Sequence, residues 1–204
     1  MNIYKKFQAW ALYRFNREYE KLISDRKKSL LGSLNGTVVE IGAGTGANLK
    51  FYSPGIRYTA IEPNEYAFPY LRIEATRLGL TGLELIRLTS EKLPFPDSSI
   101  DAVVSTLVLC TVSSQSVVIS EIRRILKPGG QFVFLEHVAA PRGSGMRRFQ
   151  GLVRPFWKVI ADGCNPDRET LEEIEGAGFS RVESERFKIF NTFVSPHIAG
   201  RAIK

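Results

Sequence analysis

The stretch VVEIGAGTG, from Val38 to Gly46, decides the fold of this chain. An apolar run suited to a buried strand leads directly into glycines at alternate positions: Gly42, Gly44 and Gly46. Glycine takes backbone angles that other residues avoid, and it leaves no side chain between main-chain amides and a ligand. A second apolar run over 56–61 ends on Glu62, where a carboxylate at a strand end can reach a ribose diol. Together the two features predict a site for an adenosine-bearing cofactor.

Two other interpretations of these glycines remain open at this point. Gly42, Gly44 and Ala47 also satisfy the dinucleotide pattern G-x-G-x-x-G/A, which would indicate NAD. The glycines could also form nothing more than a tight strand-to-helix turn. The downstream sequence decides between the cofactors.

Three further features point to one of them. Glu40 lies inside the first strand, two residues before the first glycine. SEKLPFPDSSIDAVVS covers 90–105, and RRILKPGG covers 123–130, where the proline would stop a helix and the glycines would allow a turn. In order and spacing these features resemble the class I S-adenosylmethionine-dependent methyltransferases over about residues 35–204. An NAD enzyme has no reason to carry the last two motifs.

Four shorter motifs narrow the resemblance. TLVLCTV (106–112), FLEHV (134–138), DGCN (162–165) and PHIAG (196–200) are similar to segments of the thiol S-methyltransferases of animals and of their bacterial and plant relatives. Neighbouring branches methylate ubiquinone precursors or the amino head group of phospholipids. The animal group normally begins with a longer apolar segment that anchors it in membranes, and residues 1–34 carry no such segment.

The resemblance implies a set of cofactor-binding residues. Glu62 would hold the ribose hydroxyls, Ser90 and Glu91 the adenine edge, and the Leu107 backbone the methionine amino group. Many relatives carry an acid at the position of Thr89, so the adenine contact departs from the family pattern. The complete expected set is Glu40, Gly42, Ala43, Gly44, Gly46, Asn48, Glu62, Pro63, Ser90, Glu91 and Leu107.

Methyl transfer from a sulfonium is an in-line displacement, so the protein mainly has to align two reactants in a dry pocket. A base is useful where the acceptor must lose a proton. We expect His137 to face the cleft as this base or to orient the substrate, with a purely structural hydrogen bond as the alternative. We expect Asp162 to face the substrate, although DGCN could equally serve to cap a helix.

The acceptor pocket is expected to lie beside these residues. Phe156 and Trp157 would form its apolar wall, unless this helix simply packs on the core. Cys110 also suits a core position, and His197 a structural one. Neither cysteine has metal-ligand spacing, so no zinc site or disulfide is predicted. The expected pocket residues are Cys110, Phe156, Trp157, Cys164, Asn165 and His197.

The formal net charge of +7 is unevenly distributed. Residues 1–30 carry eight bases and three acids, and their apolar and aromatic residues recur at helical spacing. Such a helix either lies on an anionic membrane surface or covers the cofactor cleft as a lid, and both roles are compatible. Nucleic acid is an unlikely partner, because the chain has no recognisable binding module.

The length and the apolar content of 44 % suit one compact enzyme domain. No apolar run is long enough to span a bilayer, and no signal peptide is recognisable. We therefore expect a cytoplasmic protein, with peripheral membrane contact as the open alternative. The sequence makes no prediction of an oligomeric state.

Alternating strand and helix patterns predict an α/β fold with a doubly wound, Rossmann-like sheet. Family resemblance adds a seventh strand inserted antiparallel. Residues 1–34 would form an amphipathic helix and 35–204 the methyltransferase domain, with a candidate hinge at 139–145. Strands are expected near 37–42, 56–62, 83–88, 100–107, 131–137, 181–188 and 197–203, and helices near 3–29, 46–52, 65–79, 114–126, 145–161 and 167–177.

The sequence thus predicts methyl transfer from S-adenosylmethionine to a small apolar acceptor, with a thiol as first choice by resemblance. Methylation of a phospholipid amine is the second choice, because of the basic N-terminal helix, and methylation of a quinone ring is the third. A protein that binds the cofactor at a membrane surface without catalysis is the alternative from another class.

Overall fold

The computed structural model describes residues 2–190 and 192–204. Its seven-stranded sheet has the order β3-β2-β1-β4-β5-β7-β6, and β7 runs antiparallel to both of its neighbours. Strands β1 to β5 pair in parallel. This arrangement confirms the expected doubly wound sheet with an antiparallel last strand. The strands are β1 (Thr37–Ile41), β2 (Arg57–Ile61), β3 (Glu84–Ile86), β4 (Ile100–Thr106), β5 (Leu126–His137), β6 (Arg181–Lys188) and β7 (Pro196–Ile203).

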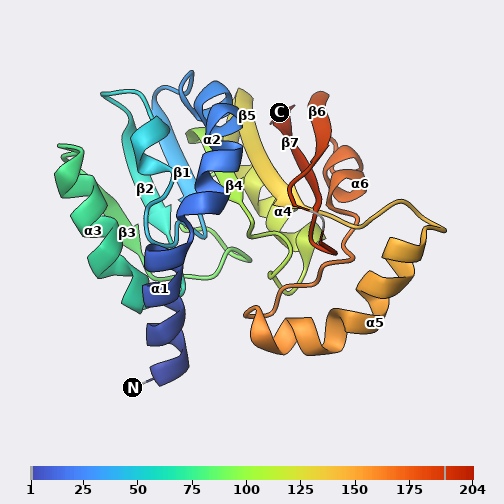
Figure 1. The fold of residues 1–204 in the computed structure, drawn as a ribbon. Helices are drawn as coiled ribbons and strands as arrows, with labels where there is room; N and C mark the ends of the chain where they lie inside the picture. The colour runs from blue at the N-terminus through green and yellow to red at the C-terminus, as the bar shows by residue number, and fades with distance from the viewer. Residues whose placement is uncertain (1, 191) are drawn as a thin grey trace.

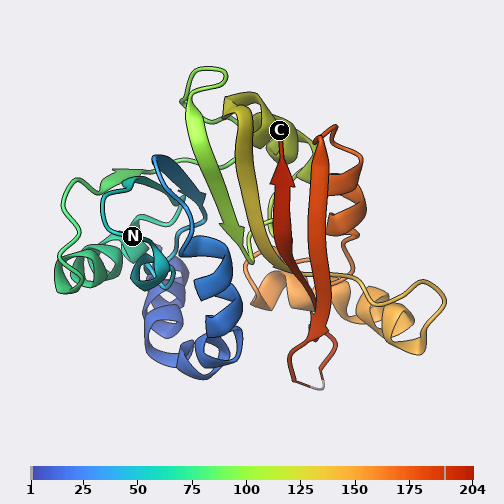
Figure 2. The same cartoon turned by 90° about the horizontal axis from the view of Figure 1, so that it is seen from above.

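Helices cover both faces of the sheet (Figure 1), and Figure 2 shows the same layers from above. They are α1 (Ile3–Phe15), α2 (Arg17–Leu31), α3 (Phe68–Arg77), α4 (Gln115–Ile125), α5 (Gly145–Ile160) and α6 (Thr170–Glu175), with 3-10 turns η1 (Leu49–Phe51) and η2 (Glu65–Ala67). Helices α4 and α6 pack with Phe132 and Phe134 on one face. Helices α2 and α3 pack with Val104 and Val133 on the other face, because successive strand residues point in opposite directions.

The N-terminal segment differs from the expectation of one helix over 3–29. Two helices form instead, and they meet at Asn16. Asparagine is a weak helix former, and the Asn16 side chain donates to Glu20 Oε1 over 3.1 Å. The break lets α1 pack against η2 while α2 packs on the sheet.

Other boundaries also differ from the sequence-based expectation. The expected helix over 46–52 is only the turn η1, and Tyr52 is already extended, with ψ 144°. Pro54 would also stop a longer helix, because it disfavours helical angles in Ser53, the residue before it. The helices expected at 65–79 and 167–177 are shorter than predicted, whereas β5 begins at Leu126 rather than at residue 131.

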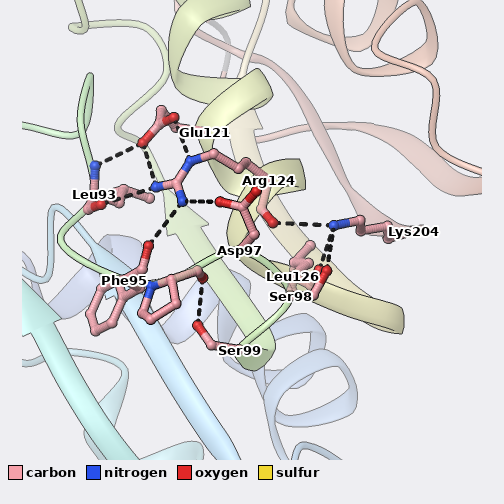
Figure 3. Close-up of polar contacts among 10 residues, drawn as sticks. Leu93, Phe95, Asp97, Ser98, Ser99, Glu121, Arg124, Leu126 and Lys204 are labelled. Carbon is pink, nitrogen blue, oxygen red and sulfur yellow. Dashed lines mark hydrogen bonds and ion pairs between the residues drawn. The ribbon is translucent and has the colours of Figure 1, made fainter.

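The segments 90–105 and 123–130 contact each other at the start of β4 (Figure 3). Arg124 donates to the carbonyl oxygens of Leu93 and Phe95 and forms ion pairs with Asp97 and Glu121. Lys204, at the C-terminal end, donates to the carbonyl oxygens of Arg124 and Leu126. The turn of residues 90–99 is thus fastened to the end of α4, which fixes its approach to the sheet.

Helices α1 and α5 lie near the same end of the sheet, the lower end in Figure 1. Tyr4 of α1 donates from its hydroxyl toward the carbonyl oxygens of Val159 and Ile160 in α5, each at 3.1 Å. Both helices leave large apolar side chains exposed, and neither contains an acidic residue. Of the described helices, none is long and apolar enough to cross a membrane.

The strand order places the site. The order β3-β2-β1-β4-β5 reverses direction between β1 and β4, and ligands of open α/β sheets bind beyond the strand ends at such a switch point. The loops after Ile41, Ile61 and Thr106 therefore meet at one edge of the sheet.

Candidate functional site

A cavity of about 580 Å³ opens where the loops after β1, β2, β3 and β4 meet. Its volume falls within the range of about 300 to 1,000 Å³ that is usual for small-molecule sites. Helices α1 and α2 contribute lining residues from the N-terminal segment. The loop after α5 reaches the cavity through Asp162.

The glycine turn forms the floor of the cavity. Gly42 and Gly44 have φ values of 59° and 54°, which L side chains rarely adopt. A Cβ atom at Gly42 would also collide with Val108. The Gly44 N–H donates to Glu62 Oε2 over 2.9 Å, and the Asn64 N–H donates to Glu62 Oε1 over 2.7 Å.

The Glu62 carboxylate therefore joins the glycine turn to the end of β2. Each carboxylate oxygen accepts one backbone N–H, which leaves further lone pairs for ligand hydroxyls. Burial raises the pKa of Glu62, and the two N–H groups oppose that rise. Glu62 lines the cavity, as the ribose-binding prediction requires.

Glu40 is the centre of a buried polar network. Asn48 Nδ2 donates to its Oε1 over 2.8 Å, and Tyr52 and Tyr58 donate to its Oε2 over 2.6 and 2.8 Å. Desolvation raises the pKa of Glu40, and these hydrogen bonds oppose the rise. Three protein donors thus hold its two oxygens, and one of these bonds fixes the amide of Asn48.

Two buried acceptors in the cavity wall have no hydrogen-bond partner among the described residues. They are Asn48 Oδ1 and Gln8 Oε1. Asn48 Nδ2 is committed to Glu40 and to Thr106 Oγ1, so its carbonyl oxygen is available to a ligand. A buried acceptor without a donor is costly, so a donor from a ligand, such as an ammonium group, would suit this position.

The cavity wall is acidic overall. It includes five carboxylates, Glu20, Glu40, Glu62, Glu91 and Asp162, against Lys5 and Lys27. Lys27 pairs with Glu20, and Lys5 pairs with Asp162. The other three carboxylates form no ion pair within the described part of the chain. Such a surface favours a ligand with net positive charge, as a sulfonium bearing an amino acid group has.

The residues expected at the adenine edge belong to the same cavity. Ser90 and Glu91 line the cavity, together with Pro63 and Leu107. Glu91 Oε1 accepts hydrogen bonds from the backbone N–H and the hydroxyl of Ser113. Desolvation raises the pKa of this half-exposed carboxyl, but the hydrogen bonds outweigh it, so the pKa is lowered. Leu107 has a φ of 58°, which turns the chain sharply after β4.

Of the expected cofactor residues, ten line the cavity and one does not. The exception is Gly46, whose missing side chain would point at Leu49 and Leu71 beneath the turn. Gly46 therefore serves packing of the turn. Sequence reasoning missed many other lining residues, among them Lys5, Gln8, Glu20, Lys27 and Asn64. Of these five, all but Asn64 come from the N-terminal helices.

Helix α1 closes over the cavity. Lys5 Nζ donates to both carboxylate oxygens of Asp162 over 2.6 and 2.7 Å, and the Lys5 carbonyl accepts from Asn64 Nδ2 over 2.9 Å. Leu12 approaches Gly44 closely. Asp162 thus faces the cavity, as expected, but Lys5 occupies its carboxylate.

His137 does not line the cavity, contrary to the expectation that it faces the cleft. The ring is buried behind the wall, and its Nε2 lies 3.0 Å from Cys164 Sγ. Trp157 Nε1 also donates to this sulfur over 3.1 Å. Contact with the Cys110 thiol lowers the pKa of Cys164, and the contacts with His137 and Trp157 lower it further. Burial of the sulfur opposes this shift without cancelling it. A role for His137 as a base stays a prediction without support from this geometry.

The remaining expected pocket residues lie away from the cavity. His197 Nδ1 donates to the Ser195 carbonyl over 2.7 Å, and its Nε2 accepts from Tyr19 at 2.9 Å. Asn165 Nδ2 donates to the carbonyl oxygens of Cys110 and Gly163, which fixes the loop.

Helix α5 is not a wall of the cavity. Phe156 is 73 % exposed, because the apolar side of α5 faces away from the domain. Trp157 packs edge-on against Phe193 and points its indole N–H at Cys164. The two aromatic residues therefore lie outside the place that the sequence suggested for them.

This geometry agrees with the comparisons to known proteins. The family described as a methyltransferase domain matches residues 39–134. Thiol S-methyltransferase TMT1B of Rattus norvegicus is 41 % identical over 201 residues, covering 92 % of this chain and 82 % of the rat protein. Thiol S-methyltransferase TMT1A of Homo sapiens is 36 % identical over 214 residues, covering 99 % of this chain and 88 % of the human protein.

A solved structure supports the fold. It is geranyl diphosphate C-methyltransferase from Streptomyces coelicolor A3(2), in complex with Mg²⁺, geranyl-S-thiolodiphosphate and S-adenosyl-L-homocysteine. The TM-score is 0.67 at 15 % identity, covering 93 % of this chain and 76 % of the other, and at this identity the likeness concerns the fold alone. The family match and the long alignments with curated methyltransferases show the enzyme class and its cofactor. The chain belongs to the S-adenosylmethionine-dependent methyltransferases, in the family of TMT1A and TMT1B.

Proposed function

We propose that this enzyme methylates small apolar thiols. The observation that carries the proposal is the similarity, over nearly the whole chain, to two proteins named thiol S-methyltransferases. The cavity supports it, since its lining includes the apolar side chains of Ala9, Leu12, Val108 and Val112.

The cofactor supplies an electrophilic methyl group on a positively charged sulfur. We assign Glu62 to the ribose hydroxyls, Asn48 Oδ1 to the ammonium group, and Ser90 and Glu91 to the adenine edge. The unpartnered Asn48 oxygen and the excess of carboxylates support this assignment. Holding the two reactants in line is the main contribution of such a site, because charge is neutralised during the transfer.

A thiol acceptor also reduces the need for a base. A free thiol has a pKa of about 8.5, so a few per cent is ionised near neutral pH without help. This suits a cavity in which Lys5 pairs with the Asp162 carboxylate and His137 lies behind the wall. We therefore expect the rate to follow the ionisation of the acceptor thiol.

A substrate panel read by mass spectrometry tests the proposal. Purified protein with S-adenosylmethionine should methylate small alkyl and aryl thiols, and matched alcohols and amines of the same shape should give no product. With a series of aryl thiols, the pH at which the rate rises should track the pKa of each thiol. Methylation of a phospholipid amine or a quinone but of no thiol would overturn the proposal. Cofactor binding without turnover of any acceptor would also overturn it.

We propose that residues 1–34 act as a lid on a methyltransferase domain formed by residues 35–204. The pairing of Lys5 with Asp162 and the approach of Leu12 to Gly44 support this, because both contacts span the mouth of the cavity. The lid would exclude water from the reacting sulfur atoms. It would also have to open for product release.

We further propose that α1 and α5 rest on an anionic membrane surface. Four side chains of α5, Leu152, Phe156, Val159 and Ile160, are 71–75 % exposed. The same helix carries Arg147, Arg148, Arg154 and Lys158, and α1 carries Lys5, Lys6 and Arg14. An acid-free helix with exposed apolar and basic residues complements anionic head groups. Apolar thiols partition into such membranes, so the surface would bring the enzyme to its acceptor.

Vesicle flotation tests the membrane surface. The protein should float with vesicles that contain phosphatidylserine and much less with pure phosphatidylcholine. A Leu152→Ser, Phe156→Ser variant should lose most of this binding. An Ile73→Ser variant, which removes an exposed apolar residue of α3, is the matched control and should float like the wild type. Equal flotation of all three proteins would contradict the assignment of this surface.

A further inference from the structure

Three residues of the chain come together behind the cavity although they are far apart in the sequence. Cys110 follows β4, His137 ends β5, and Cys164 lies in the irregular stretch after α5. Their sulfur and ring nitrogen atoms all lie within 4.8 Å of one another, and all three residues are buried. His137 Nε2 and Cys164 Sγ are 3.0 Å apart. No sequence spacing predicts this cluster, because only the sheet brings the three segments together.

The cluster has the composition and size of a metal site. Zn–S and Zn–N bonds of about 2.3 and 2.0 Å put the ligand atoms of a tetrahedral site about 3.6 to 3.8 Å apart. His137 Nε2 and Cys164 Sγ are closer than this, at 3.0 Å, and no two ligand atoms are more than 4.8 Å apart, so side-chain shifts of about 1 Å would centre an ion. Two thiols with an imidazole form a soft donor set, which favours zinc over magnesium or calcium.

The surroundings of the cluster fit the same interpretation. Trp157 Nε1 donates to Cys164 Sγ over 3.1 Å, and N–H donors to sulfur are usual around metal-bound cysteines. His137 Nδ1 is buried and has no hydrogen-bond partner among the described residues. Nε2, the nitrogen beside Cys164, would bind the ion, and Nδ1 would carry the ring proton, as in a neutral histidine ligand.

We propose that Cys110, His137 and Cys164 form a binding site for one Zn²⁺ ion. Three protein ligands leave the fourth tetrahedral position to water or to another small ligand, as in zinc sites of the Cys₂His type. The site adjoins the methyl-transfer cavity without being part of it. Leu107, Thr111 and Asp162 line that cavity, and each lies within three residues of a cysteine of the cluster. This inference does not depend on the identity of the methyl acceptor.

Cobalt substitution tests the site directly. Metal-free protein under a non-thiol reductant is titrated with Co²⁺, and sulfur-to-cobalt charge-transfer absorption is recorded. Cys110 and Cys164 are the only cysteines of the chain, so such a band can come only from this cluster. We expect saturation at one equivalent of Co²⁺ and full loss of the band when one equivalent of Zn²⁺ is added. Metal analysis of protein from zinc-supplemented cells should give about one zinc per chain.

Variants separate the cluster from other sites. Cys110→Ser, Cys164→Ser and His137→Gln should each weaken Zn²⁺ binding at least about 10-fold. His197→Gln replaces the second histidine, whose ring centre is 6.3 Å from that of His137, and it should keep the wild-type stoichiometry. Circular dichroism checks that each variant folds. If a variant does not fold, the titration of the wild-type protein still tests the site.

The outcomes are distinguishable from those of the methyl-transfer assays. Folded wild-type protein that shows no charge-transfer band and no more zinc than a Cys110→Ser, Cys164→Ser double variant would overturn the proposal. Such a result would leave thiol methylation untouched, because metal content and absorption are read without turnover.

Discussion

The Gly44 N–H donates to the Glu62 carboxylate over 2.9 Å, and this bond ties the glycine turn after β1 to the end of β2. The contact links the two sequence features that predict the cofactor site. It also gives the carboxylate a fixed orientation while leaving lone pairs for a ribose diol. Both the shape of the turn and the placement of the ligand therefore depend on position 62.

Replacing Glu62 with glutamine should weaken S-adenosylmethionine binding about 10- to 100-fold, because hydrogen bonds to charged groups contribute about 1.5 to 3 kcal/mol. The loss should be equal for 5′-methylthioadenosine, which shares the ribose. Isothermal titration measures both affinities. Glu65→Gln, on the half-exposed carboxyl that pairs with Arg87, is the matched control and should bind normally. Unchanged affinity in Glu62→Gln would refute the ribose assignment.

Asn48→Ala should have a different signature. Its Oδ1 is buried without a partner in a residue that lines the cavity, so we assign it to the ammonium group of the cofactor. The variant should bind S-adenosylmethionine about 10- to 100-fold more weakly and yet bind 5′-methylthioadenosine, which lacks the ammonium, within about twofold of the wild type. Equal losses for both ligands would instead indicate that the turn itself is distorted.

Breaking the pair between Lys5 and Asp162 should loosen the lid. Their side chains are 34 % and 46 % exposed, so the pair is worth at most about 1 kcal/mol. Lys5→Met should therefore raise the dissociation rate of S-adenosylhomocysteine no more than about fivefold. Stopped-flow displacement measures the rate, and Lys6→Met, in the same helix but outside the cavity lining, is the control. A lid role is contradicted if both variants release the ligand at the wild-type rate.

The buried pair of Lys27 and Glu20 should matter more for stability. Lys27 Nζ donates to both carboxylate oxygens over 2.8 and 2.9 Å, and its side chain is 2 % exposed. Lys27→Met should lower the free energy of unfolding by about 3 to 5 kcal/mol, because it leaves the buried Glu20 charge without its cationic partner. Lys21→Met removes an exposed ion pair in the same helix and should change the free energy of unfolding by less than about 0.5 kcal/mol. Urea denaturation compares the two variants, and equal effects would contradict this energetic ranking.

The local parts of the fold and site were predictable from sequence, and the long-range parts were not. The glycine turn and Glu62 were found because their signal lies within a short strand-turn-strand segment. Lys27 is one of the eight bases of residues 1–30, and its spacing of seven residues from Glu20 does not by itself show that the two side chains are buried together. Phe156 was misplaced because an amphipathic helix pattern does not say which way its apolar side faces. The meeting of His137 with Cys164 depends on the sheet order and has no local signal.

His197 should make stability depend on pH in a defined direction. Burial lowers the pKa of its imidazole to about 4, so the folded protein keeps it neutral while the unfolded chain takes up a proton below about pH 6.5. Stability should therefore fall as the pH falls from about 6.5 to about 4, by at most about 3 kcal/mol, and this contribution should be constant above that window. His197→Gln has no titrating group and can still bond with Tyr19 and Ser195. Urea unfolding of both proteins across the window isolates the effect of His197. Burial raises the pKa of Glu136 to about 7, so Glu136 also titrates near this window, but it does so in both proteins and cancels in the difference. A difference between the two proteins that does not change with pH would show that the folded state protonates His197 as readily as the unfolded chain does.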